Sequence, residues 1–232
     1  MAKTLDSLLT IFPFEKKCFE KTSLPVQYIG HPLTQTVSTF TPLGKFKGKI
    51  LGIFPGSRKT EIDRNLPLQL KVARRLKQLD PSLKLYVSAT QFDLDIPDAY
   101  IVKPEDNYEL MRASYLAIAT SGTVNLELAL HQTPTVVNFA IRPLDCWIAQ
   151  KIFRINLPFY SIVNIILNRS VFPELFGPNL TEESLFFWAH KFLVEEEARI
   201  ECKKGCKEIL KSLGMKSSAE EAANSIFSTV DF

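Results

Sequence analysis

The stretch KILGIFPGSRKTEIDRNLPLQLKVARRLKQL, residues 49–79, joins a short apolar run to a helical pattern. The run KILGIF ends at Pro55-Gly56, and apolar side chains then recur at helical spacing. The side chains in question are Leu66, Leu70, Ala73 and Leu76. An apolar segment that ends in a turn and leads into an amphipathic helix is typical of one strand–helix unit of an α/β sheet.

The same alternation continues toward the C-terminus. Further apolar runs, each expected to form a strand, are LKLYVSA at 83–89, AYIVK at 99–103, YLAIAT at 115–120 and TPTVVNFA at 133–140. Short helices are expected between them, at 107–113 after an Asp106 cap and at 124–131. Apolar strands that alternate with helices indicate a parallel sheet covered on both faces. The predicted fold class is therefore α/β, with a Rossmann-like parallel sheet and helices on both of its faces.

The chain is expected to fall into four parts. Residues 1–33 hold too little apolar surface for a domain and look like the remnant of a preceding one. Residues 34–48 are polar and rich in turn-forming residues, which predicts a linker. The strand–helix units occupy 49–180, and two or three helices are expected in 181–232. The glycines at which these last helices could break are Gly205 and Gly214.

Composition excludes several classes of protein. The net charge is +3 and basic residues are scattered among acidic ones, so no nucleic-acid partner is expected. The four cysteines and three histidines show no metal-binding spacing, which predicts free thiols in a reducing cytoplasm, with neither a metal nor a cofactor. The start MAKTLDSLL has no signal-peptide pattern, and the longest apolar stretch, 157–167, is shorter than the ~20 residues that span a bilayer.

Two loops at the ends of predicted strands have the chemistry for binding phosphate. In the first, after residue 54, Gly56 allows close backbone approach, Ser57 carries a hydroxyl and Arg58 a planar guanidinium. The second comprises Ser121, Gly122 and Thr123 at the start of a helix, where free amides favour an anion. Either loop alone is equally well an ordinary turn or helix cap. Because both follow strands of the same predicted sheet, their carboxyl ends should lie close together and bind one ligand.

Glu127 lies four residues after Thr123, one turn along the same helix face. A carboxylate in this place can accept hydrogen bonds from the hydroxyls of a ribose. The alternative is a surface glutamate in a first helical turn, which the helix dipole stabilises. The residues alone leave both interpretations open.

An ordered set of motifs resembles the lipid-A-disaccharide synthase family from about residue 11 to the C-terminus. The motifs are FPFEKK at 12–17, YIGHPL at 28–33, FPGSRKTEI at 54–62, ATSGTVNLELAL at 119–130, TPTVVNF at 133–139 and VFPELF at 171–176. The blocks PGSR-x-x-E and SGT-x-x-LE are the most specific. The resemblance implies a GT-B glycosyltransferase, built from two Rossmann-like domains that face each other across a cleft.

The family's reaction transfers 2,3-diacylglucosamine from UDP-2,3-diacylglucosamine to lipid X, releases UDP and forms the β-1,6-linked lipid A disaccharide. The resemblance places Gly56, Ser57 and Arg58 on the diphosphate loop. It places Ser121, Gly122, Thr123 and Glu127 on the nucleotide-binding loop and helix, which makes 49–180 the UDP-sugar-binding domain. Asn164 matches the Asn of the family's LPN segment, near the donor, although Val163 replaces the Pro before it. The catalytic residues are unknown, because the base is expected in the missing N-terminal acceptor domain, and the chain is expected to be incomplete.

The stretch 142–163 is apolar with basic flanks, carrying Trp147, Ile148, Lys151, Ile152, Phe153 and Arg154. It would suit a helix lying peripherally on the inner face of the bacterial inner membrane, and a substrate with acyl chains favours that interpretation. The alternative is a helix under the sheet or in a homodimer interface.

Two alternatives to a lipid A glycosyltransferase stay open. One is a non-catalytic nucleotide-sugar-binding or assembly module from a truncated or split gene. The other is a different GT-B enzyme, such as a UDP-GlcNAc epimerase, which would need a pair of carboxylates near the sugar.

Overall fold

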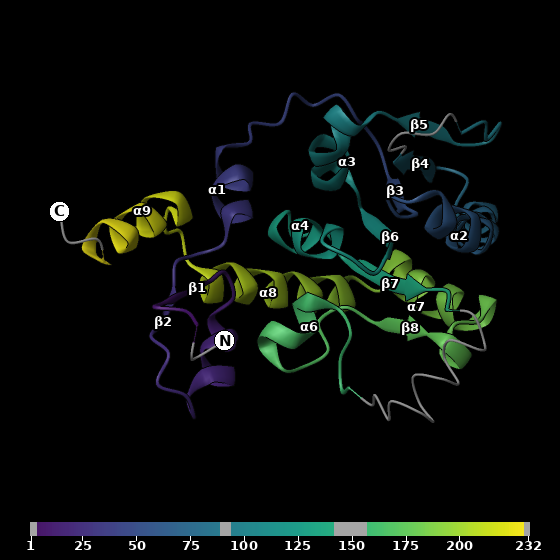
Figure 1. Cartoon of the computed structure of the whole chain (residues 1–232). Helices are drawn as coiled ribbons and strands as arrows, with labels where there is room; N and C mark the ends of the chain where they lie inside the picture. Colours follow the sequence, from purple (N-terminus) through teal and green to yellow (C-terminus); the bar gives the residue numbers. More distant parts are fainter. Residues whose placement is uncertain (1–3, 89–93, 142–156, 230–232) are drawn as a thin grey trace.

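The computed structural model describes residues 4–88, 94–141 and 157–229. Its centre is a six-stranded sheet in the order β5-β4-β3-β6-β7-β8, in which all paired strands are parallel (Figure 1). The strands are β3 Ile50–Phe54, β4 Lys84–Ser88, β5 Tyr100–Val102, β6 Leu116–Thr120, β7 Thr135–Phe139 and β8 Glu174–Phe176. The strand order reverses between β3 and β6, as in Rossmann-like folds. The α/β prediction is confirmed.

Alternate side chains of the central strands enter two different apolar cores, which explains why the strands are apolar throughout. Leu51 and Ile53 of β3 belong to a large core with α2 (Lys59–Leu79) and α7 (Glu182–Val194). Ile50 and Phe54 belong to a smaller core with α3 (Asn107–Ala113) on the opposite face. Burial on both faces is what a parallel sheet requires.

The predicted helices are present, and two details of them differ from the expectation. The helix over 107–113 is confirmed, but the Asp106 side chain does not cap it and instead forms an ion pair with Lys45. Three helices occupy the C-terminal region: α7, α8 (Glu196–Leu213) and α9 (Ser218–Thr229). Gly214 ends α8, as expected, whereas α8 continues through Gly205, so the prediction of a break there is wrong. Gly205 lies buried inside α8, where a Cβ would come within 2.6 Å of Val171, so the glycine serves close packing.

The strand expected at 133–140 is present as β7, with α4 before it in the chain and α6 after it. Helix α4 spans Val124–Leu130, and α6 spans Ile162–Leu167 just before β8. Strand β8 is a sixth strand that the sequence patterns do not predict. It has three residues and extends the sheet by pairing with β7.

The N-terminal segment forms a separate small sheet. Strands β1 (Leu8–Thr10) and β2 (Val26–Tyr28) pair in parallel, joined by a 3-10 helix over Pro13–Phe19. Figure 1 shows α8 extending from the main sheet to this small sheet, with α9 beyond it. The Tyr28 hydroxyl donates to the Leu213 carbonyl at 2.6 Å, so the end of α8 holds the N-terminal segment in place.

The segment expected to be a linker is partly helical. Helix α1 spans Pro32–Thr39, with His31 as its N-cap, and an irregular stretch follows up to β3. The buried Glu109 carboxylate accepts hydrogen bonds from the backbone of Leu43 and Lys45, which ties this stretch to α3. Helix α1 has only eight residues, and four of them are Thr or Ser, which is why its sequence resembles a polar linker.

Within the described ranges, no helix is long and apolar enough to cross a membrane. Trp147, Ile148 and the other residues of the expected membrane-facing surface up to 156 lie outside the described residues.

Candidate functional site

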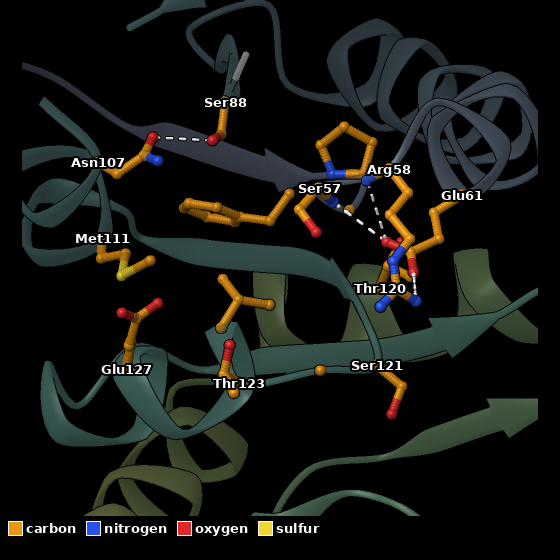
Figure 2. A pocket seen from close by; sticks show the side chains of 15 residues that line it. Ser57, Arg58, Glu61, Ser88, Asn107, Met111, Thr120, Ser121, Thr123 and Glu127 are labelled. Atoms are coloured by element: carbon orange, nitrogen blue, oxygen red, sulfur yellow. Dashed lines mark hydrogen bonds and ion pairs between the residues drawn. The ribbon is translucent and has the colours of Figure 1, made fainter. Parts of the chain in front are cut away.

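A cavity of about 380 Å³ opens at the carboxyl ends of β3 and β6, where the strand order reverses (Figure 2). This is the position at which open parallel sheets bind ligands, because the loops leading into helices diverge there. Seven of the eight residues predicted for the site line this one cavity. They are Gly56, Ser57, Arg58, Ser121, Gly122, Thr123 and Glu127.

The loop after β3 is organised around the carboxylate of Glu61, in the first turn of α2. Oε2 of Glu61 accepts hydrogen bonds from the backbone amides of Ser57 at 3.1 Å and Arg58 at 3.3 Å. Gly56 has φ +113°, and a Cβ there would lie 2.7 Å from the same Oε2. Glycine is therefore required both by the backbone conformation and by the close carboxylate. The two loop amides already hold a negatively charged oxygen, which shows that their geometry suits an anion.

The guanidinium of Arg58 is the most accessible positive charge of this loop. Its Nη1 lies 3.3 Å from Oε1 of Glu61, and 80% of the side chain is exposed. An exposed ion pair of this kind contributes only about 0–1 kcal/mol. Little is therefore lost if the guanidinium turns toward an anion in the cavity, because bidentate contacts of arginine with an anion are stronger.

The loop after β6 is fixed from below by a buried polar network. The Ser121 amide donates to the Asn138 carbonyl at 3.1 Å. Gln69 of α2 donates to the side chains of Thr120 and Asn138, and Asn138 donates to Asn65 at 2.9 Å. These contacts connect α2 with β6 and β7 beneath the cavity. Buried hydrogen bonds of this kind hold the loop in place, because their groups are costly to leave unpaired. Within the described residues, Oε1 of Gln69 is a buried atom without a hydrogen-bond partner.

Glu127 is held by Tyr108 and is not a solvated surface carboxylate. The Tyr108 hydroxyl donates to Oε1 of Glu127 at 3.1 Å. Burial raises the pKa of Glu127, and the hydrogen bond from Tyr108 opposes that shift. Burial and the neighbouring carboxylate raise the pKa of Tyr108 to about 12. Figure 2 shows Glu127 and Arg58 on opposite sides of the cavity, so a carboxylate and a cation line the same space.

Several lining residues were not predicted from the sequence. Ser88 at the end of β4 donates from its hydroxyl to Asn107 at 2.8 Å, and both line the cavity with Met111 and Glu61. Ser88 and Asn107 are polar residues that follow β4 and β5, so the rule that identified the two phosphate-type loops could also have found them. Glu61 is the last residue of the PGSR-x-x-E block, but its contact with the loop amides depends on how α2 leaves the loop and was not predicted.

Asn164, predicted to lie near the donor, does not line this cavity. It is fully buried in α6, and both polar atoms of its side chain are used. Nδ2 donates to the Phe172 carbonyl at 2.8 Å and to Glu174 at 2.7 Å, while Oδ1 accepts from the amides of Val171 and Phe172. The side chain therefore shapes the turn into β8. Glu174 in turn accepts from the amides of Tyr160 and Ser161, so Asn164 positions that segment without facing the first cavity.

Comparison with known proteins agrees with the motifs. The family described as lipid-A-disaccharide synthetase matches residues 1–227. A lipid-A-disaccharide synthase of Chlamydia trachomatis is 35% identical over 99% of this chain, and one of Synechocystis is 30% identical over 95%. The chain spans only 41% and 61% of the length of these two relatives.

Solved structures share the fold at low sequence identity. A structure described as a UDP-N-acetylglucosamine 2-epimerase from Listeria monocytogenes has a TM-score of 0.68 at 14% identity, covering 99% of this chain and 61% of its own. The glycotransferase of kitacinnamycin has a TM-score of 0.58 at 10% identity, covering 95% of this chain and 54% of its own. At these identities the likeness concerns the GT-B fold alone. The match of the family over 1–227, together with the two relatives, shows that this chain belongs to the lipid-A-disaccharide synthetase family.

Proposed function

We propose that this chain binds the nucleotide part of a UDP-sugar for glycosyl transfer in lipid A biosynthesis. The donor is UDP-2,3-diacylglucosamine, the acceptor is lipid X, and the products are UDP and the β-1,6-linked disaccharide. Family membership supports the reaction, and the curated relatives carry the matching name.

The observation that carries the proposal is that two strand-to-helix loops meet in one cavity. The loop of Gly56, Ser57 and Arg58 offers the exposed guanidinium of Arg58, and Glu127 offers a carboxylate across the same space. A nucleoside diphosphate presents the complementary groups, namely two phosphates and the hydroxyls of a ribose. Departure of UDP leaves negative charge on the diphosphate, and Arg58 is placed to stabilise it.

Contact of the apolar segment with a lipid surface belongs to the same proposal, and a homodimer interface through that segment is the alternative. The acyl chains of donor and acceptor require the site to meet a membrane, and peripheral attachment at the inner face of the inner membrane satisfies that need. The stretch expected to make this contact is the apolar segment from 142 onward.

Calorimetric titration with UDP tests the proposal. Saturable binding by the folded chain is expected, and uridine should bind more weakly because it lacks the phosphates. Absence of heat with millimolar UDP, in a sample whose folding is checked by circular dichroism, would contradict the proposed function. A non-catalytic nucleotide-binding module would bind UDP equally well. An assay of UDP release from UDP-2,3-diacylglucosamine distinguishes this module from a transferase. A transferase releases UDP when lipid X is added, whereas a binding module releases none.

A further inference from the structure

A second cavity, of about 270 Å³, lies against the same loop that closes the first one. Ser121, Gly122 and Thr123 line both cavities. The remaining lining residues of the second cavity come from the N-terminal segment, from α4 and from the region before β8. They are Phe12, His31, Leu33, Leu126, Tyr160 and Ile162.

This second cavity is the place where the two parallel sheets direct their carboxyl ends toward each other. Phe12 follows β1 and His31 follows β2, both strands of the small sheet. Ser121 follows β6 of the large sheet. The carboxyl ends of parallel strands are the usual ligand-binding edge, and here two such edges share one space. A group attached to a phosphate in the first cavity needs to pass only the Ser121–Thr123 loop to reach it.

The imidazole of His31 has a defined hydrogen-bonding role in this space. Its Nδ1 accepts a hydrogen bond from the Leu33 amide at 3.2 Å, as the N-cap of α1. A nitrogen that accepts this bond carries no proton, so in the neutral ring the proton is on Nε2. Burial lowers the pKa of His31, against a smaller opposing effect of Glu15, which favours the neutral ring at neutral pH. His31 is thus a donor through Nε2, and this tautomer has no free basic nitrogen.

The rest of the lining is mostly apolar. The Phe12 ring lies 4.9 Å from the His31 ring, centroid to centroid, and Leu33, Leu126 and Ile162 add aliphatic surface. The polar groups among this apolar surface are the His31 imidazole and the hydroxyl-bearing side chains of Ser121, Thr123 and Tyr160. A few polar groups in a mostly apolar cavity suit a sugar whose neighbouring positions carry hydrocarbon. A free phosphate or an unsubstituted hydrophilic sugar would leave this apolar surface unmatched.

We propose that the second cavity receives the glycosyl group of the sugar nucleotide with the first part of its acyl chains, and that His31 positions it by donating from Nε2 to a sugar or acyl oxygen. The inference rests on the proposed function, because it requires the diphosphate to occupy the first cavity. His31 then positions the sugar nucleotide, and the Ser121–Thr123 loop contacts both its diphosphate and its glycosyl group.

His31→Asn tests the proposal. Asparagine is a favoured N-cap, and its Oδ1 can replace Nδ1 of His31 as acceptor for the Leu33 amide, while the Nε2–H donor is lost. Calorimetry compares UDP with a short-chain UDP-2,3-diacylglucosamine. The affinity for the sugar nucleotide should fall about 3- to 10-fold, the scale of one net hydrogen bond, while UDP binds as in the wild type. His190→Asn, the same change on α7 outside the residues lining either cavity, should alter neither affinity.

A second variant tests the space itself. Ile162→Trp fills the cavity and should also weaken binding of the sugar nucleotide but not of UDP. If both variants bind the sugar nucleotide like the wild type, the glycosyl group lies elsewhere and the inference is overturned. Equal loss of UDP and sugar nucleotide in both variants would also overturn it, since the second cavity would then only support the loop. A wild-type chain that does not bind UDP at all would instead refute the proposed function.

Discussion

Replacing Arg58 by alanine separates phosphate binding from every other contribution of the first cavity. The guanidinium is 80% exposed and touches Glu61 at 3.3 Å, so its removal should leave the fold almost unchanged. Uridine and UDP differ only in the phosphates. A residue that holds the diphosphate should therefore affect UDP and leave uridine alone.

The size of the effect follows from the two partners that compete for the guanidinium. A hydrogen bond to a charged group stabilises by about 1.5–3 kcal/mol. Turning Arg58 toward the ligand gives up an exposed ion pair with Glu61 that contributes about 0–1 kcal/mol. The net loss for Arg58→Ala should thus be about 0.5–3 kcal/mol, or roughly 2- to 160-fold in the dissociation constant of UDP. Arg58→Lys should restore part of this, because a point charge cannot reproduce the planar fork.

Calorimetric titration of UDP and uridine into wild type, Arg58→Ala and Arg58→Lys measures these differences. Lys59→Ala is the matched control, because Lys59 is the next basic residue, is 69% exposed and pairs with Asp63. Lys59 does not belong to the residues that line the first cavity. The reasoning is refuted if Arg58→Ala weakens uridine as much as UDP, which would mean that Arg58 shapes the pocket. It is also refuted if Lys59→Ala weakens UDP equally, which would reduce the effect to general charge.

Three further predictions concern stability and the remaining site residues. Burial raises the pKa of Glu127 above its ordinary value of 4.5, so ionisation of this carboxyl destabilises the folded chain as the pH rises through the raised pKa. Glu127→Gln should therefore raise the melting temperature at pH 8 but not at pH 3.5, and it should weaken UDP binding. A change in melting temperature that does not depend on pH would show that burial of the charge is not the cause. Asn164→Ala should lower the free energy of unfolding, measured by urea denaturation, by about 2–4 kcal/mol, because it leaves buried backbone groups unpaired. The folded variant should bind UDP like the wild type. Loss of UDP affinity at unchanged stability would support a direct ligand contact instead. Gly56→Ala should destabilise by at least ~1 kcal/mol and weaken UDP binding, because φ is +113° and the new Cβ would displace Glu61 from the loop amides; a variant as stable as the wild type would show that the loop can relax.

Local patterns were sufficient for the parallel sheet and for the two loops. The runs 49–54 and 115–120 are buried on both faces, so nearly every residue in them is apolar. Such a run can be recognised without knowing which distant segments pack against it. Gly56 and the Ser121–Thr123 loop are short segments at strand ends, and any parallel arrangement of these strands brings those ends to the same edge. The family motifs are equally local.

What only the tertiary structure decided depends on contacts between distant segments. Strand β8 has three residues and exists because β7 offers it a free edge, which no local pattern records. A glycine is typical of a helix end, yet Gly205 lies inside α8. Val171 occupies the space that a larger side chain at this position would need. Asn164 matches a ligand-binding motif, yet its amide is used by backbone groups seven to eight residues later in the chain.

The second cavity is the furthest from anything the sequence could show. His31 and Ser121 are ninety residues apart, and they line one space because the small and large sheets direct their carboxyl ends at each other. In the sequence His31 stands beside Gly30 and Pro32, a setting typical of a turn. Strand-forming runs and loop chemistry are local and can be read from the chain, whereas the placement of one sheet against another is set by long-range packing, here through α8 and the Tyr28 hydrogen bond to Leu213.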